Sequence, residues 1–188
     1  MAKRRKPCWW GAFRGDVVWD GLEERDGGKP GGGGFAEWAS FAPQVKVYSR
    51  TRGRCFHVRL SGGRVGIFVL YNRGERWGES IRAHERHHVV AHMRPAYADY
   101  RRAAAALGRV CMSRPRAEWV GAVILNQLRA EYIARSYRDA TRHDWEAYGR
   151  RASAEVRRDA WERMTTWSRR YATARKATAV ALAAGPVD

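Results

Sequence analysis

The sequence predicts an α+β fold, in which an antiparallel sheet of about four strands is followed by three helices. Before residue 72, short segments rich in Val, Phe, Tyr and Trp are separated by turn signals that contain Gly, Asp or Asn. After Ser80 the glycines thin out, and apolar residues recur at spacings of three and four among many Ala, Arg and Glu residues. Strands first and helices afterwards, without alternation, is the α+β pattern.

The strands are expected in four segments that are bounded by these turn signals. They are residues 35–41, 44–48, 55–60 and 64–71. Ser61-Gly62-Gly63 is predicted to form the hairpin turn between the last two strands. The four glycines at residues 31–34 are expected to form a flexible loop before the first strand.

The three helices are predicted from apolar spacing and from start and stop residues. The first runs from about Ser80, its expected N-cap, to Leu107, with a kink before Pro95. The second begins after residues 113–115 and presents one apolar face, formed by Val120, Ile124, Leu128 and Tyr132. The third covers about residues 153–184.

Length and composition indicate one folded domain. A chain of 188 residues with nine Trp, eight Tyr and five Phe is long and aromatic enough to bury a core. We expect a basic aromatic segment at residues 1–15 and a single domain at 16–188, with the sheet in 16–79 and the helices in 80–188. Three widely spaced cysteines predict neither a CxxC site nor a disulfide framework.

The charge and the apolar runs bear on partners and location. With 36 Lys and Arg against 19 Asp and Glu, the net charge of +17 makes nucleic acid a candidate partner, although basic surface alone is the simpler interpretation. No apolar run approaches the roughly 18 residues of a membrane span. The basic N-terminus lacks the apolar segment of a signal peptide, so the chain by itself is expected to be cytoplasmic.

The first predicted helix carries an HExxH motif at His84, Glu85 and His88. Histidines four residues apart lie on one helical face, so both imidazoles can reach one zinc ion. Zinc lowers the pKa of a bound water, and Glu85 is then the candidate general base that takes the water proton. The alternative is a solvated helix face on which Glu85 and Arg86 pair with neighbours.

A catalytic zinc needs a third protein ligand, and the same helix offers no comfortable one. His87 points away from the His84 face, and the Cα atom of His92 is expected about 12 Å from that of His84. The long metalloprotease motif would place a third histidine at position 94, which is Arg94. The third ligand is therefore expected from another element.

His143 on the second helix is the favoured third ligand. It lies eleven residues after Tyr132, about 20° further around the helix, so it continues the apolar stripe. Asp139, one turn earlier on that stripe, is a candidate to orient a ring nitrogen of His143. The alternatives are Glu131 and Glu146 as ligands, or a solvated helix end without any metal.

With these residues the chain resembles an uncharacterised bacterial family of zinc-dependent proteases with an HExxH helix. Val17-Val18-Trp19-Asp20 is similar to the short first strand of that family, and residues 35–41 to an aromatic strand that follows it. The segment at residues 84–88 is similar to the core motif HEQxHF, with Arg86 and Val89 in place of the Gln and the Phe. Residues 137–143 are similar to a second helix with a Tyr, an acid-Thr pair and a His, with Ala140 in place of the acid. The resemblance covers about residues 16–150 and implies a zinc hydrolase, usually exported, on a zincin-like fold.

The sequence thus predicts a zinc-dependent metallohydrolase, most simply a peptidase that acts on peptide or protein substrates. A strand that precedes the HExxH helix is expected to align an extended substrate, and residues 64–71 occupy that place in the order. Two alternatives stay open. One is a basic nucleic-acid-binding module, whose arginines contact phosphates. The other is a metal-free binding scaffold with the same fold.

Overall fold

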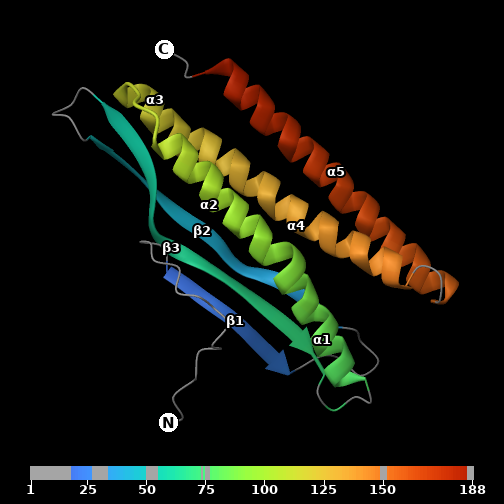
Figure 1. Ribbon diagram of the computed structural model, residues 1–188. Coiled ribbons are helices and arrows are strands. Elements are labelled where there is room, and N and C mark those ends of the chain that lie inside the picture. The colour runs from blue at the N-terminus through green and yellow to red at the C-terminus, as the bar shows by residue number, and fades with distance from the viewer. Residues whose placement is uncertain are drawn as a thin grey trace, which may run out of the picture. The chain divides into compact units, whose positions relative to one another are not determined.

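The computed structural model describes residues 18–26, 34–49, 55–72, 74, 77–148 and 152–185. Within these residues three strands are followed by helices, which confirms the α+β class (Figure 1). The basic segment at 1–15 and the glycines at 31–33 lie outside the described residues. The chain divides into two compact units, one formed by residues up to Val45 and by Leu60–Val89, the other by Lys46–Arg59 and Val90–Asp188.

The sheet is mixed and has three strands among the described residues, in the order β1-β3-β2. Strand β1 runs parallel to β3, with Val18 opposite Arg64. Strand β2 runs antiparallel to β3, because Ser40 donates a hydrogen bond to the Arg64 carbonyl whereas the later Tyr48 lies beside the earlier His57. The prediction of four strands in a purely antiparallel sheet was wrong. The strands are β1 (Val18–Asp26), β2 (Phe35–Ser49) and β3 (Phe56–Tyr71).

The predicted hairpin turn at residues 61–63 is instead part of the continuous strand β3. Gly62 and Gly63 have φ values of 67° and 85°, which suit glycine in a bend as well as in a turn. A Cβ atom on Gly63 would lie 2.3 Å from the Ala42 carbonyl oxygen, so the neighbouring strand needs glycine here. Pro43 likewise lies inside β2, which is at an edge of the sheet, where a missing N–H is tolerated.

The core of the first unit is built on one face of β3. Every second residue near its end is at most 1% exposed, as the period of two of a strand requires. These residues are Val65, Ile67, Val69 and Tyr71. Burying four large apolar side chains on one face fixes the register of β3, because a slip by one residue would turn all of them outward.

Among the residues that the structure describes, the helices fall into three stretches at the predicted positions. The first begins at Gly78, two residues before the expected cap Ser80, and ends at Gly108. Ser113 and Ser153 cap the other two through their hydroxyl oxygens, which accept hydrogen bonds from the backbone. The segments are α1 (Gly78–His88), η1 (Val89–Met93), α2 (Arg94–Gly108), α3 (Arg114–Trp119), η2 (Val120–Ile124), α4 (Leu125–Tyr148) and α5 (Ala154–Ala184).

The irregularity expected before Pro95 is a π-helical segment, η1, which ends two residues before this proline. Proline has no N–H to donate to the carbonyl four residues earlier, and its ring crowds that carbonyl. A widened π turn is one way to accommodate such a conflict without ending the helix. The helical stretch therefore continues through Pro95 into α2.

The second unit buries side chains that η1 and α2 present at spacings of three and four, namely Met93, Tyr97, Tyr100 and Ala104. Helices α4 and α5 lie side by side (Figure 1). The ring of Tyr137 stacks on that of Trp167 at 4.3 Å, and Trp145 meets Trp161 at 5.2 Å, so the two helices run antiparallel. None of the described helices is long and apolar enough to cross a membrane.

The second unit also contains a disulfide, which the sequence analysis did not expect. Cys55 and Cys111 are bonded, and their Cα atoms are 5.2 Å apart. The next residues, Phe56 and Met112, exchange two backbone hydrogen bonds of 2.9 and 3.0 Å. This short bridge aligns the start of β3 with the segment after α2, and it brings together two cysteines that are 56 residues apart in sequence.

We expect the second unit to lose stability above pH 10 because of Tyr100. Burial raises the pKa of Tyr100 from 10.0 to about 12, so the unfolded chain releases this proton first. The contribution is intact below pH 10 and is lost as the pH approaches 12, by roughly 2–3 kcal/mol. Urea unfolding measured across this range should show the loss in the wild type and in the exposed control Tyr148→Phe. It should be smaller in Tyr100→Phe, where Tyr97, whose pKa burial also raises, still contributes, and an unchanged loss in that variant would contradict the assignment.

Candidate metal centre

The HExxH residues lie on α1 in the first unit, with the geometry that their spacing predicts. The Nε2 atoms of His84 and His88 are 2.9 Å apart, and their rings meet edge to face with centroids 4.5 Å apart. One carboxylate oxygen of Glu85 and one nitrogen of each histidine all lie within 4.8 Å of one another. Three potential metal ligand atoms therefore converge on one small volume.

This donor set fits zinc. Zinc binds imidazole nitrogens at about 2.0–2.1 Å, so two nitrogens of a tetrahedral site lie about 3.3 Å apart. The two Nε2 atoms are 2.9 Å apart, and a shift of about 0.4 Å would bring them to that separation. His88 is 3% exposed and Glu85 7% exposed, so the site has little access to bulk water. A cation there would offset the cost of burying the Glu85 carboxylate.

Two arginines of α1 form ion pairs with Glu24 of strand β1. Arg82 donates two hydrogen bonds to Oε2 of Glu24, at 3.0 and 2.8 Å, and Arg86 lies 3.0 Å from Oε1. The hydrogen bond to Glu24, followed by that to Glu79, raises the pKa of Arg82. Arg86 is the third residue of the HExxH motif, so this ion pair fixes the orientation of the turn that carries Glu85.

Gly34, the residue before β2, lets the backbone approach the motif closely. A Cβ atom here would lie 2.6 Å from the Ile81 side chain, 2.7 Å from the Leu70 carbonyl oxygen and 2.8 Å from Cγ of Glu85. The Leu70 oxygen belongs to the backbone of β3 and has little freedom to move. Glycine is therefore needed at position 34 to place the start of β2 against Glu85.

Gly34→Ala is expected to destabilise the first unit by about 1–3 kcal/mol, the usual cost of overpacking a well-filled site. The added methyl group must push Glu85 or Ile81 aside, because the Leu70 carbonyl is held in the sheet. Urea unfolding would measure the effect. Gly74→Ala is the matched control, since its nearest neighbour would be the Asn72 side chain at an ordinary 3.5 Å. Equal stabilities of the two variants would contradict this account of Gly34.

The strand expected to align a substrate is not available for that role. Residues 64–71 belong to β3, which is the central strand and is hydrogen-bonded to β1 on one side and to β2 on the other. Neither side of β3 is open to a further strand along these residues. Among the described strands only β1 and β2 lie at an edge, and β2 is the one that begins beside Glu85.

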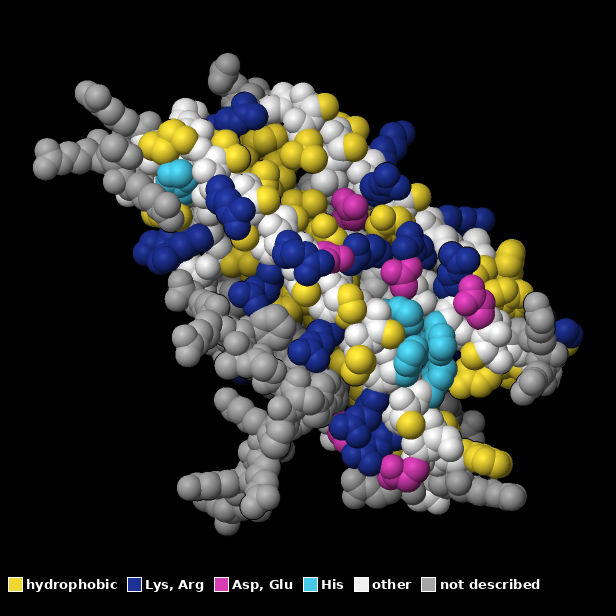
Figure 2. Space-filling view, viewed as in Figure 1, with side chains coloured by type: hydrophobic (Ala, Val, Ile, Leu, Met, Phe, Trp, Pro, Cys, Tyr) yellow, Lys and Arg dark blue, Asp and Glu magenta, His cyan; other side chains and the backbone are white. Residues whose placement is uncertain are grey.

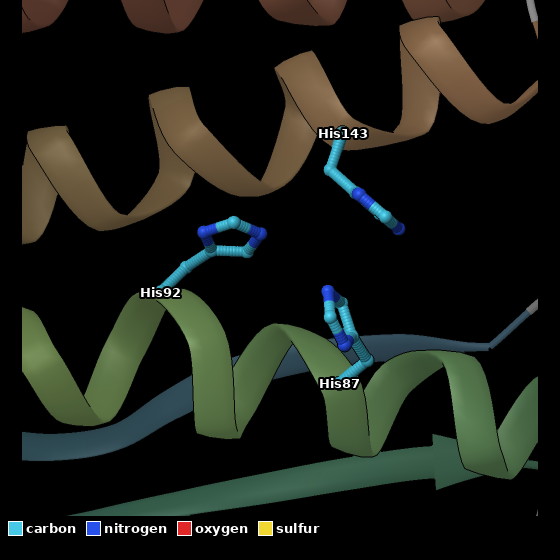
Figure 3. Close-up of side chains that lie close together, drawn as sticks. All are labelled: His87, His92 and His143. Atoms are coloured by element: carbon cyan, nitrogen blue, oxygen red, sulfur yellow. The ribbon is translucent and has the colours of Figure 1, made fainter.

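His143 lies on α4 in the second unit, where its ring lies near that of His92 from η1, with centroids 5.9 Å apart and the two ring planes tilted by 49° (Figure 3). The sequence excludes His92 as a third ligand of the HExxH pair because of its distance along the helix. It does not predict that His92 lies near His143. Asp139 forms an ion pair with Arg138, with an oxygen of Asp139 2.6–2.8 Å from two guanidinium nitrogens. The assignments of His143 as third ligand and of Asp139 as its support stay predictions.

The alternative ligands also lie on α4. Glu146 is exposed and forms an i,i+4 ion pair with Arg142 at 2.9 Å, as a solvated helix face does. Glu131 is half-buried on the same helix.

Glu24 and Gly34 were missed by sequence reasoning, because Glu24 lies in a strand and Gly34 lies in a glycine run that resembled a loop. A Gly run directly before a strand is the signal that could have indicated close backbone approach.

Comparison with known proteins does not place the chain in a family. No family model matches it, and neither a curated protein nor a solved structure shows significant similarity to it. The resemblance to bacterial zinc proteases therefore stays a prediction that rests on the motifs of this sequence.

Proposed function

We propose that the protein is a zinc-dependent metallohydrolase, most simply a peptidase. The observation that carries the proposal is the convergence of two imidazole nitrogens, 2.9 Å apart, with the Glu85 carboxylate on one helical turn, where Glu85 and His88 are buried and His84 is half-buried. His84 and His88 would hold the metal, and Glu85 would be the general base.

Zinc, when bound, would supply a water ligand of lowered pKa and polarise the scissile carbonyl. The chain's own residues then do the proton transfer. Glu85, beside the histidine pair, accepts a proton from the attacking water and delivers it to the leaving amine. Burial of Glu85 excludes competing water, and the Glu24 ion pairs with Arg82 and Arg86 keep the helical turn in place.

A peptide substrate would bind in an extended conformation along β2. This strand lies at an edge of the described sheet, and its first residues reach Glu85 at Gly34. Edge strands recognise peptides through backbone hydrogen bonds, which tolerate many side chains. The position of β2 therefore favours extended peptides as the substrate class. In this role β2 replaces residues 64–71 of the central strand β3, which the sequence suggested.

The test is zinc content and hydrolysis on the same preparation. Protein purified without added zinc or a polyhistidine tag should carry about one zinc per chain, and it should cleave an unfolded protein such as reduced casein. A chelator should remove both metal and activity, and added zinc should restore them. Protein with far less than one zinc per chain that also fails to take up zinc at neutral pH would refute the proposal.

Nucleic-acid binding remains the second candidate, carried by the surplus of basic residues. The face seen in Figure 2 carries Lys and Arg side chains in several separate places, some of them beside acidic side chains. Several arginines are already paired with Asp or Glu, among them Arg82, Arg114, Arg135 and Arg163.

Six or more phosphate contacts would make duplex binding fall by orders of magnitude between low and physiological salt. Tight binding that persists at physiological salt would favour this candidate over the peptidase, and a folded protein with neither activity would favour the metal-free scaffold.

A further inference from the structure

The Cys55–Cys111 disulfide lies beside a buried histidine that the proposed zinc chemistry does not use. Nε2 of His57 is 3.2 Å from Sγ of Cys55, and Nδ1 of His57 is 3.1 Å from the Gly108 carbonyl oxygen. His57 is 7% exposed, Cys55 is half-buried and Cys111 is exposed. All four residues belong to the second unit.

These contacts fix which ring nitrogen of His57 carries the proton. A carbonyl oxygen only accepts hydrogen bonds, so Nδ1 must donate to Gly108. In the neutral imidazole Nε2 is then without a proton, and its lone pair is directed at Sγ of Cys55. A Cys55 thiol formed by reduction would therefore meet a proton acceptor at hydrogen-bond distance.

The surroundings keep His57 in this position. Gly108 allows the close approach of the two backbones, because a Cβ atom on it would lie 2.3 Å from the Val58 carbonyl oxygen. The Tyr48 ring lies against His57 at 5.6 Å, and the Arg59 guanidinium lies over the Tyr48 ring at 5.5 Å.

We propose that Cys55 and Cys111 form a redox-active pair that exchanges with low-molecular-weight thiols, and that His57 is its catalytic acid–base residue. The incoming thiolate attacks Sγ of Cys111, because Cys111 is exposed whereas Cys55 is half-buried. The external thiol gives up its proton to Nε2 of His57, the bond between the two cysteines breaks, and Cys55 leaves as a thiolate that pairs with this protonated His57. A stabilised leaving thiolate departs faster, which makes attack at Cys111 the favoured direction.

The exchange balances without any further reagent. In the first step the external sulfur bonds to Cys111, and the electron pair of the broken S–S bond stays on Cys55. A second external thiolate then attacks the external sulfur of this mixed disulfide and releases Cys111. Two external thiols are oxidised to their disulfide, while the protein disulfide is reduced to two thiols, and the reverse reaction restores it. This chemistry is independent of the zinc site.

The proposal is tested on the full chain with Cys8→Ser, so that only the pair remains. The oxidised protein is treated with reduced glutathione, quenched with acid, alkylated and mapped by mass spectrometry. Glutathione should be found on Cys111 and the alkyl group on Cys55. His57→Asn keeps an N–H for Gly108 but removes the base, and it should slow the exchange about tenfold or more. His87→Asn, at an exposed histidine of α1, is the matched control and should leave the rate unchanged.

A second measurement on the reduced Cys8→Ser protein does not depend on any histidine variant. With a limiting amount of iodoacetamide near pH 7, Cys55 should be alkylated before Cys111, although Cys111 is the more exposed. The Cys55 thiolate should also titrate below the ordinary thiol pKa of about 8.5. Glutathione on Cys55, faster alkylation of Cys111, or equal exchange rates in His57→Asn and the wild type would each overturn the proposal.

Discussion

Replacement of His88 by alanine is expected to abolish stoichiometric zinc binding. A zinc site with four ligands has an apparent binding free energy of roughly 10–16 kcal/mol, so each ligand accounts for about 3 kcal/mol or more. The loss of one ligand should weaken binding about a hundredfold or more. The same loss is expected for His84→Ala, since the two Nε2 atoms lie 2.9 Å apart and would share one ion. Elemental analysis after dialysis would measure it.

His87→Ala serves as the control for these variants. His87 occupies the neighbouring position of the same helix and is exposed, whereas His88 is 3% exposed. The control should therefore retain zinc at the level of the wild type. If His87→Ala and His88→Ala lost equal amounts of zinc, the ion would not be held by the HExxH pair. Thermal unfolding should separate lost affinity from lost fold, because added zinc should raise the melting temperature of the wild type and leave that of His88→Ala unchanged.

The helical part of the fold could be predicted because its signals are local. Serine caps at Ser113 and Ser153, the stop at Gly108 and the apolar spacing between them are set by residues within a few turns. The π-helical segment before Pro95 follows from the missing N–H of that proline, although its form was not foreseen. The HExxH geometry could be predicted for the same reason, since two residues four positions apart in a helix always lie on the same face.

The sheet could be predicted only in part, because strand pairing depends on residues far apart in sequence. Gly62-Gly63 favours a hairpin turn when it is considered alone, yet positive φ values are also those of a bend inside a strand. The close approach of Ala42 from β2 decides between the hairpin turn and the bend, and no local sequence pattern predicts this contact. The parallel pairing of β1 with β3 is likewise non-local, and it is this pairing that makes β3 central.

The contacts that support the two sites were not predictable for the same reason. Glu24 meets Arg82 across 58 residues, and Cys55 meets Cys111 across 56. A cysteine count gives no connectivity, and an odd number of cysteines spread along a basic chain argues weakly against any pair. The HExxH motif was therefore visible in the sequence, whereas the ion pair of Glu24 beside it, the edge position of β2 and the disulfide beside His57 required the structure.

Replacement of Glu85 by glutamine is expected to leave zinc bound while hydrolysis falls by about two to four orders of magnitude, the usual contribution of a general base. The amide has the size of the carboxylate and can occupy the same space beside Gly34, where Cγ of Glu85 packs closely. It does not accept a proton from water at neutral pH, so the chemical step is lost. The loss should appear in kcat, because extended peptide binding along β2 does not require the charge of residue 85.

Glu79→Gln is the matched control for this variant, because Glu79 lies on the same helix and its carboxylate is exposed. It removes one charge and one ion pair, the 2.9 Å contact with Arg82, while Arg82 keeps its two hydrogen bonds to Glu24. Its hydrolysis rate should therefore stay within about twofold of the wild type, as expected for a surface ion pair. Zinc content and kcat measured side by side separate the possible outcomes. Full activity in Glu85→Gln would remove Glu85 from the mechanism, and loss of zinc together with activity would make it a ligand and not the base.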